Sequence, residues 1–424
     1  MYQLDAEFFS GNAGQTRWRI LQHIAMRGPV DVRLIAEESN LASSTVRYYV
    51  DKFLKTGLLQ RSGTKEGPGG RPSRLFQFSF DAGCVVGAEI SREAIRVNTV
   101  DLAGELHSSY EEPLVLQDDV APAQVIAGSI NRGIEQAGTD RCHVIGVGVA
   151  VQGLYYGPDD VWLYWPAPKP LDHIPLQSAL SRELELPVLV EDHGRVRLLA
   201  EQQRGILRGK RNAILVWVGS GIASYFCFDG KVFRGGNGMN GEFGHLIIEP
   251  DGPLCRCGRR GCLEAIASIP SIVETARQQI GHTSLSSMSQ LAAASDDLTI
   301  HDILQAAEHG DQTAYIALRQ AGERIGQAIS IMLNVIGPTL VIVGGPLRHS
   351  PVVLDAIRDV VRLEVVQPLF PMIDIQASQL GDGAGVLGAA FLEVEHLFAQ
   401  PRIPPDLLSL WTRTAIVQPA GPAS

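Results

Sequence analysis

The stretch GEFGHLIIEPDGPLCRCGRRGCLEA, residues 241–265, contains three of the chain's six cysteines, Cys255, Cys257 and Cys262, and also His245. Three thiolates and one imidazole form the ligand set of a closed, tetrahedral structural zinc site, which leaves no position for a catalytic water. The glycines between the cysteines allow a short loop to fold back, so that all three thiols reach one ion. The alternative, a surface loop with free thiols, does not explain why half of the cysteines cluster here. The sequence therefore predicts a structural zinc site.

The same stretch resembles the signature of the ROK family, whose members are repressors, open reading frames and kinases. The resemblance rests on Glu242-Phe243-Gly244-His245 and on residues 255–264, Cys-Arg-Cys-Gly-Arg-Arg-Gly-Cys-Leu-Glu. It implies that zinc fixes a loop in which Glu242, His245 and Glu264 contact the hydroxyl groups of a bound sugar. The alternative is that the two glutamates only orient the metal loop. Because the family contains both sugar kinases and sugar-responsive transcription factors, the rest of the chain has to decide between them.

Charge is distributed unevenly along the 424 residues. The net charge is −10, yet residues 15–80 carry eleven Lys or Arg against five Asp or Glu. A basic segment on an acidic body predicts a nucleic-acid-binding module. The N-terminus does not resemble a signal peptide, and there is no apolar run of about 18 residues or more, so we expect no membrane span. The cysteine pattern suits a reducing cytoplasm, which is the predicted localisation.

Residues 15–80 show the pattern of a winged helix-turn-helix. Apolar spacing predicts helices over 17–27 and 31–39 and a third from Ser43 or Ser44 to about residue 56, with Asp31 capping the second. Two strand-like runs, 58–61 and 75–80, predict the arms of a wing around a Gly-rich, basic linker. The alternative is a small helical bundle with a solvated charged face and a flexible linker. The excess of positive charge favours DNA binding.

We expect the third helix to lie in the major groove with its N-terminal residues towards the base edges. The Gly69-Gly70-Arg71-Pro72 element resembles one in ROK-type repressors, and Arg71 is expected to enter a narrow minor groove. The alternative is that this element only spaces two domains. The residues predicted to bind DNA are Ser43, Ser44, Thr45, Arg47, Tyr48, Lys52 and Arg71.

From Cys84 onward, strand-like runs alternate with amphipathic segments, which predicts an α/β fold with helices covering a mixed sheet. The resemblance to the ROK family adds an actin-like (ribonuclease H-like) duplicated fold with the ligand cleft between two lobes. We thus expect a DNA-binding domain over 1–80, a sugar-binding domain over 81–396, and a weakly ordered tail over 397–424 with a short helix at 405–412. Helices of the body are expected at 121–137, 174–185, 195–207, 264–280, 312–336 and 351–365.

The body lacks two features that phosphoryl transfer requires. ROK kinases have Asp-x-Gly-Gly-Thr after the first strand, where glycines let backbone N–H groups approach phosphates; residues 89–93 here read Glu-Ile-Ser-Arg-Glu. The family's catalytic Asp, the proton acceptor in Glu-Asn-Asp-x-Asn, is replaced by His193. A one-residue shift would let Asp192 act as the base, but the phosphate turn would still be missing. We therefore predict no catalytic residues, and a ligand site that includes Asp192 and His193.

The sequence thus predicts a sugar-responsive regulator that resembles the N-acetylglucosamine- and xylose-type repressors of the family. We expect it to bind a double-stranded, palindromic operator as a homodimer or homotetramer, because paired half-sites require two-fold symmetry. A sugar or sugar phosphate between the lobes is expected to release it. Two alternatives remain, a ROK sugar kinase with an appended DNA-binding domain and a repressor that a protein partner controls.

Overall fold

The computed structural model describes residues 7–66, 72–79, 82–116, 120–138, 143–164, 174–236, 240–280, 298–337 and 339–413. The chain forms two compact units, residues 1–203 with 383–424 and residues 204–382. The N-terminal segment, which we expected to be a domain of its own, belongs to the first unit. None of the described helices combines the length and the apolar character that crossing a membrane would demand.

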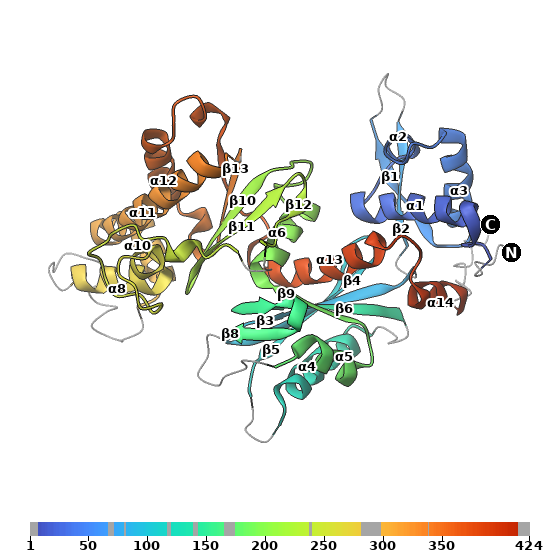
Figure 1. Ribbon diagram of the computed structural model, residues 1–424, viewed down its shortest axis with the longest axis horizontal. Coiled ribbons are helices and arrows are strands. Elements are labelled where there is room, and N and C mark those ends of the chain that lie inside the picture. Colours follow the sequence, from blue (N-terminus) through green and yellow to red (C-terminus); the bar gives the residue numbers. More distant parts are fainter. Residues whose placement is uncertain are drawn as a thin grey trace. The chain divides into compact units, whose positions relative to one another are not determined.

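The first unit begins with three helices and a pair of strands that form a head (Figure 1). These are α1 (Gly11–Arg27), α2 (Val32–Ser39), α3 (Ser43–Lys55), β1 (Leu59–Lys65) and β2 (Ser73–Phe78). Asp31 caps α2 as predicted, because its carboxylate accepts the backbone N–H of Leu34 at 2.8 Å. The predicted serine cap of α3 is wrong: Ala42 holds that position and makes no side-chain bond. The helix-turn-helix itself is present.

The wing of the head is a small antiparallel sheet. β1 pairs with β2. Val30 forms an isolated antiparallel bridge on the other side of β2, exchanging backbone hydrogen bonds of 3.0 and 2.8 Å with Phe76. The arms are longer at the linker end than predicted, since Lys65 still pairs with Ser73. The backbone N–H and C=O groups of this polar segment therefore form hydrogen bonds with the partner strand, which the side-chain pattern did not indicate.

Each unit contains a five-stranded mixed sheet, and the two sheets have the same strand order. In each, the first strand in sequence is central, the next two run antiparallel on one side, and the last two run parallel on the other. This repetition confirms the duplicated, ribonuclease H-like fold. The first sheet is β5 (Leu106–Pro113), β4 (Ala94–Asp101), β3 (Cys84–Ile90), β6 (Val144–Val151) and β9 (Val188–Asp192). The second is β12 (Lys231–Val232), β11 (Ile222–Phe228), β10 (Ala213–Val218), β13 (Leu340–Gly344) and β14 (Asp374–Ala377).

Helices cover both faces of the first sheet (Figure 1). Alternate residues of β3 show the division: Val85 belongs to the core that includes α13, and Val86 to the core that includes α4 and α5. The hairpin of β7 (Leu154–Tyr156) and β8 (Val161–Tyr164) lies between β6 and β9 in the chain. The helices are α4 (Pro122–Gln136), α5 (Leu176–Leu184), α6 (His193–Arg204) and α13 (Ala384–Ala399).

The second unit inserts most of its helices between β12 and β13. They are α7 (Leu263–Ala267), α8 (Ile269–Ile280), α10 (Ile300–Glu308) and α11 (Gln312–Ile336), with α12 (Pro351–Glu364) after β13. The helix predicted over 264–280 is broken at Ser268, whose backbone is extended. The sequence reading missed α10, although Thr299 and Asp302 form a capping box at its start.

The C-terminal segment contains two helices. α13 continues to Ala399, and α14 (Pro405–Arg413) follows it. Trp411 is buried, and its Nε1 donates a hydrogen bond to the carbonyl of Ala82 at 2.7 Å. The short helix predicted at 405–412 is confirmed by α14, whose apolar residues join the core of the head. Residues 414–424 lie outside the described part.

Candidate functional site

The exposed face of α3 carries the residues that we expected to contact DNA. Ser43, Ser44, Arg47 and Tyr48 are exposed, and Thr45 and Lys52 are partly exposed. The Lys52 ammonium lies 4.6 Å from the centre of the Tyr48 ring, and a hydrogen bond from Lys52 lowers the pKa of the Tyr48 hydroxyl. Arg71 lies outside the described residues. The face thus presents hydroxyl and cationic groups, the types that reach phosphates and base edges.

The head packs against α13 through α1. Trp18 stacks on Phe398 with ring centres 5.1 Å apart, and its Nε1 donates to the carbonyl of Gln400 at 2.8 Å. The Gln22 amide donates to the carbonyls of Phe398 and Gln400 at 2.7 and 2.9 Å. These partners are more than 370 residues apart in sequence, so no local pattern indicated them. The head and the end of α13 therefore share one core.

The other end of α13 lies very close to its neighbours. A Cβ atom on Gly388 would stand 1.8 Å from the carbonyl oxygen of Val196 on α6. A Cβ on Gly148 of β6 would stand 1.8 Å from the carbonyl oxygen of Ala389. Only glycine allows backbones to approach this closely. α13 is thus fixed against both α6 and the first sheet.

Glu89 lies near the end of β3, where a kinase of the family has its phosphate turn. Its side chain is only 4% exposed and forms an ion pair with Arg197 of α6, and Arg96 Nη1 lies 3.8 Å from its other oxygen. A phosphate needs cationic or N–H groups that are not already neutralised. A buried carboxylate with an arginine partner does not provide them.

Asp192 and His193 lie where β9 leads into α6. Asp192 Oδ1 accepts the backbone N–H groups of Gly194 at 2.9 Å and Arg195 at 3.3 Å, and so caps the helix. Burial raises the pKa of Asp192 to about 6 and lowers that of His193 to about 3. His193 Nδ1 lies 3.9 Å from Asp192 Oδ2. The two residues are therefore neighbours in the first unit, and the histidine is neutral at physiological pH.

The four predicted metal ligands meet in the second unit. The ligand atoms of His245, Cys255, Cys257 and Cys262 all lie within 4.8 Å of one another. Cys257 Sγ and Cys262 Sγ are 3.6 Å apart, and His245 Nδ1 is 3.7 Å from Cys255 Sγ. Tetrahedral zinc with thiolate bonds of about 2.3 Å places its sulfurs about 3.8 Å apart, so the cluster fits this ion. A backbone N–H bond and then the side chain of Arg259 lower the pKa of Cys257 to about 6, which favours the thiolate that a metal binds.

The two glutamates predicted to bind a sugar lie next to this cluster. Glu242 Oε2 is 3.7 Å from Nε2 of His245, the ring nitrogen that faces away from Cys255. Glu264, at the start of α7, accepts the backbone N–H of Ile222 at 3.1 Å. Glu242 is mostly exposed, whereas Glu264 is buried. The second unit thus positions Glu242, His245 and Glu264 along one metal loop, while Asp192 and His193 belong to the first unit.

Sequence reasoning missed Arg256, which forms an ion pair with Glu264: Arg256 Nε lies 2.8 Å from Glu264 Oε1. Its position between Cys255 and Cys257 was visible in the sequence, but spacing alone does not indicate where an arginine side chain points. The pair places a cation beside a residue expected to bind a sugar.

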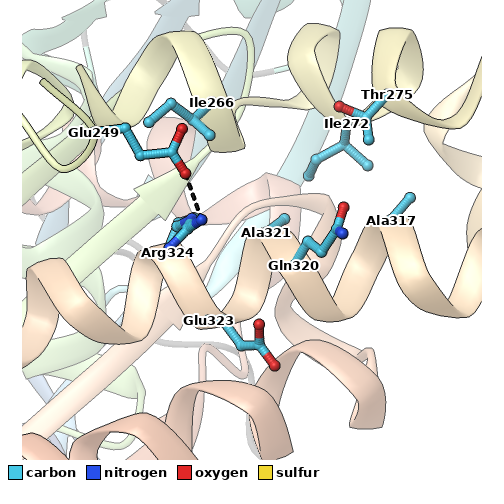
Figure 2. A pocket seen from close by; sticks show the side chains of 9 residues that line it. All are labelled: Glu249, Ile266, Ile272, Thr275, Ala317, Gln320, Ala321, Glu323 and Arg324. Carbon is cyan, nitrogen blue, oxygen red and sulfur yellow. Dashed lines mark ion pairs between the residues drawn. The ribbon is translucent and has the colours of Figure 1, made fainter. Parts of the chain in front are cut away.

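A cavity of about 270 Å³ lies on another side of α7 (Figure 2). Ile266, two residues after Glu264, faces it, and the ion pair of Glu249 with Arg324 closes one end at 2.5 Å. None of the residues expected to bind the sugar lines this cavity. Its lining consists of Glu249, Ile266, Ile272, Thr275, Ala317, Gln320, Ala321, Glu323 and Arg324.

Comparison with known proteins places these features in context. The sequence model of the ROK family matches residues 85–395, downstream of the head. The xylose repressor of Caldicellulosiruptor bescii is 25% identical over 87% of this chain and 92% of its own. A glucokinase of Halalkalibacterium halodurans is 27% identical over 72% of this chain and 94% of its own. The crystal structure of a ROK family transcriptional regulator, a homologue of E. coli Mlc, matches with a TM-score of 0.76 and 23% identity over 94% of this chain and 99% of that one.

Proposed function

The chain belongs to the ROK family, and we propose that it is a sugar-responsive transcriptional repressor of carbohydrate genes. In this proposal the head, α1 to β2, binds operator DNA until a sugar or sugar phosphate releases it. The observation that carries the proposal is the head itself, a helix-turn-helix with an exposed α3 that is built into the core of the first sheet. Phosphoryl transfer to a sugar does not by itself require a helix-turn-helix. The match to a xylose repressor over most of both chains supports the same function.

DNA recognition is assigned to α3 and the wing. The N-terminal turn of α3, with Ser43 and Ser44, faces the base edges, and Arg47 and Lys52 contact bases or phosphates. Arg71, in the linker between the wing strands, is proposed to enter the minor groove. A homodimer or homotetramer would present two heads to a palindromic operator.

The effector is assigned to the residues that the family resemblance indicates, Asp192, His193, Glu242, His245 and Glu264. Carboxylates suit sugars because each oxygen accepts hydroxyl donors. Zinc is assigned to His245 and the three cysteines, where it would cross-link the loop between β12 and α7 and keep its shape. The chemistry that the metal supplies there is structural.

The route from the effector to the head runs through α6 and α13. α6 begins at His193, and Val196 on its next turn touches Gly388 of α13. The far end of α13 holds Trp18 of the head. An effector that favours one arrangement of α6 therefore favours one placement of the head. The effector needs a different affinity for the two arrangements, because equal affinity would shift neither.

The kinase alternative has one residue in its favour, Asp192, because burial raises its pKa to about 6 and so makes it a better proton acceptor. Its Oδ1 is already an acceptor for two backbone N–H groups. Glu89, just before the position of the phosphate turn, is paired with Arg197. We therefore assign no catalysis to this site.

The test is a gel-shift titration on DNA upstream of the protein's own gene at fixed salt, because phosphate contacts make affinity salt-dependent. We expect one added compound to release the DNA. The compounds to add are D-xylose, D-glucose, N-acetylglucosamine and their phosphates. Arg47→Ala should weaken specific binding by about tenfold, whereas Arg362→Ala on exposed α12 should not. Specific binding that no sugar changes would move control to a protein partner. The absence of specific binding, with ATP-dependent turnover of a hexose, would refute the proposal.

A further inference from the structure

The side chain of Arg256 leaves the metal loop to reach α7. Its Nε lies 2.8 Å from Oε1 of Glu264, and its Nη2 lies 3.3 Å from Oε2. Two guanidinium nitrogens thus face two carboxylate oxygens, a two-point contact that an arginine makes and a lysine does not. The arginine is about half exposed and the carboxylate is buried, so Arg256 covers Glu264 from the solvent side.

Glu264 is held from a second direction by the turn between β10 and β11. Ile222 N–H donates to Oε2 at 3.1 Å, and a Cβ atom on Gly221 would stand 2.6 Å from this same oxygen. Oε2 therefore has an N–H donor and the guanidinium as partners. Oε1 accepts from Arg256 Nε and retains acceptor capacity for a hydroxyl. The direction of that acceptor depends on where Arg256 places the carboxylate.

We propose that Arg256 is a positioning residue for the effector and makes effector affinity depend on the metal. It orients Oε1 of Glu264 towards a sugar hydroxyl, and its backbone is held by its two neighbours, Cys255 and Cys257. When the metal is removed, Cys255 and Cys257 are no longer held by one ion, and the backbone position of Arg256 is no longer fixed. The inference rests on the proposed function, which assigns Glu264 to the effector.

The chain supplies two matched controls, one at a helix that anchors the loop and one in the loop itself. Glu249 pairs with Arg324 of α11 at 2.5 Å, which anchors the loop without touching Glu264 (Figure 2). Arg260 is exposed and donates to the carbonyl of Gly252 at 3.3 Å. Arg324→Ala therefore tests loop anchoring in general, and Arg260→Ala tests the loss of one positive charge.

The first experiment needs no effector. Hydrogen exchange of the full-length, metal-loaded protein reports the Ile222 amide, which is protected by Glu264. Arg256→Ala should retain its metal and raise exchange at Ile222 by about tenfold, and chelation of the wild-type metal should do the same. Neither control variant should change this amide. Unchanged protection of Ile222 in Arg256→Ala would overturn the inference, whatever the effector is.

The second experiment titrates D-xylose, D-glucose, N-acetylglucosamine and glucose 6-phosphate by calorimetry. For the sugar that wild type binds, Arg256→Ala should raise Kd by roughly tenfold or more, and Arg256→Lys should recover part of the loss. Chelation should weaken wild type by a similar factor and add little to Arg256→Ala. An equal loss in Arg324→Ala would mean general loop anchoring and overturn the inference. If wild type binds none of these sugars, the proposed function loses its effector, and the exchange experiment still decides the role of Arg256.

Discussion

The two lobes of the fold, which are the first and second units, repeat one strand order. They differ in what holds the turn after the central strand. In the first lobe the turn follows Glu89, which a buried ion pair with Arg197 fixes against α6. In the second lobe the turn contains Gly221, and the N–H of the next residue, Ile222 of β11, donates to Glu264 on the helix after the metal loop. The first turn is thus held by its own packing and charges, and the second by the helix that follows a loop with four candidate metal ligands. We infer that the first lobe transmits a change of state to the head and that the second lobe depends on its metal to sense the ligand.

The largest expected effect is loss of the metal from the second lobe. Cys262→Ser removes a buried ligand and should lower the free energy of unfolding of the second unit by roughly 5 kcal/mol or more. Calorimetry with metal analysis should show one destabilised transition and one unchanged transition. Cys227→Ala in β11 serves as the control because it removes a buried thiol outside the cluster. A Cys262→Ser protein that unfolds like the wild type would contradict the metal dependence of this lobe.

The corresponding change in the first lobe is Arg197→Ala. It leaves the Glu89 carboxylate buried without its main partner, which should cost about 4 kcal/mol in the first unit. Arg96→Ala should cost less than about 1 kcal/mol, because Arg96 is partly exposed and 3.8 Å from Glu89. The double variant Glu89→Leu/Arg197→Met should recover most of the loss in a denaturant titration. Equal effects of Arg197→Ala and Arg96→Ala would show that the buried pair is not what holds this turn.

A second buried carboxyl makes the first lobe sensitive to pH. Burial of Glu393 on α13 raises its pKa to about 7, above the usual value of 4.5. The folded state therefore binds more protons than the unfolded state between these values, and stability falls as pH rises from 4.5 to 7. The loss amounts to up to about 3 kcal/mol. In unfolding titrations at pH 5 and pH 8, Glu393→Gln should remove the part of the pH dependence that comes from this carboxyl, whereas Glu364→Gln on the exposed surface of α12 should leave the pH dependence unchanged. A wild-type protein equally stable at both values would contradict the assignment.

The smallest effect concerns the contact between α13 and the head. Trp18→Phe keeps a ring against Phe398 but loses the hydrogen bond from Nε1 to Gln400, which should cost about 1 kcal/mol. A thermal scan of the first unit measures this loss, and operator affinity should fall in the same variant if the contact seats the head. Leu106→Ala at the exposed edge of β5 should change either quantity little. If Trp18→Phe has the thermal stability and the operator affinity of the wild type, the hydrogen bond from Trp18 to Gln400 does not hold the head.

The sequence by itself determined the features that depend on neighbours a few residues apart. The metal cluster is an example, because Cys255, Cys257 and Cys262 lie in one loop and their spacing already limits what they bind. The cap of α2 by Asp31 and the full length of α11 follow from the same local rules. The resemblance to the ROK family correctly added the duplicated sheet order, which periodicity does not contain.

Only the tertiary structure decided the contacts between distant segments. The pair of Glu89 and Arg197 spans 108 residues, and the bond from Trp18 to Gln400 spans 382. The sequence predicted a short helix at 405–412, but only the fold brings Trp411 of this helix to the carbonyl of Ala82, 329 residues away. The physical reason is that burial energy depends on which surfaces meet, whereas spacing along the chain reports only which residues share a local face. Arg256 illustrates both cases. The sequence shows that it lies between two predicted metal ligands, but only the fold shows its ion pair with Glu264.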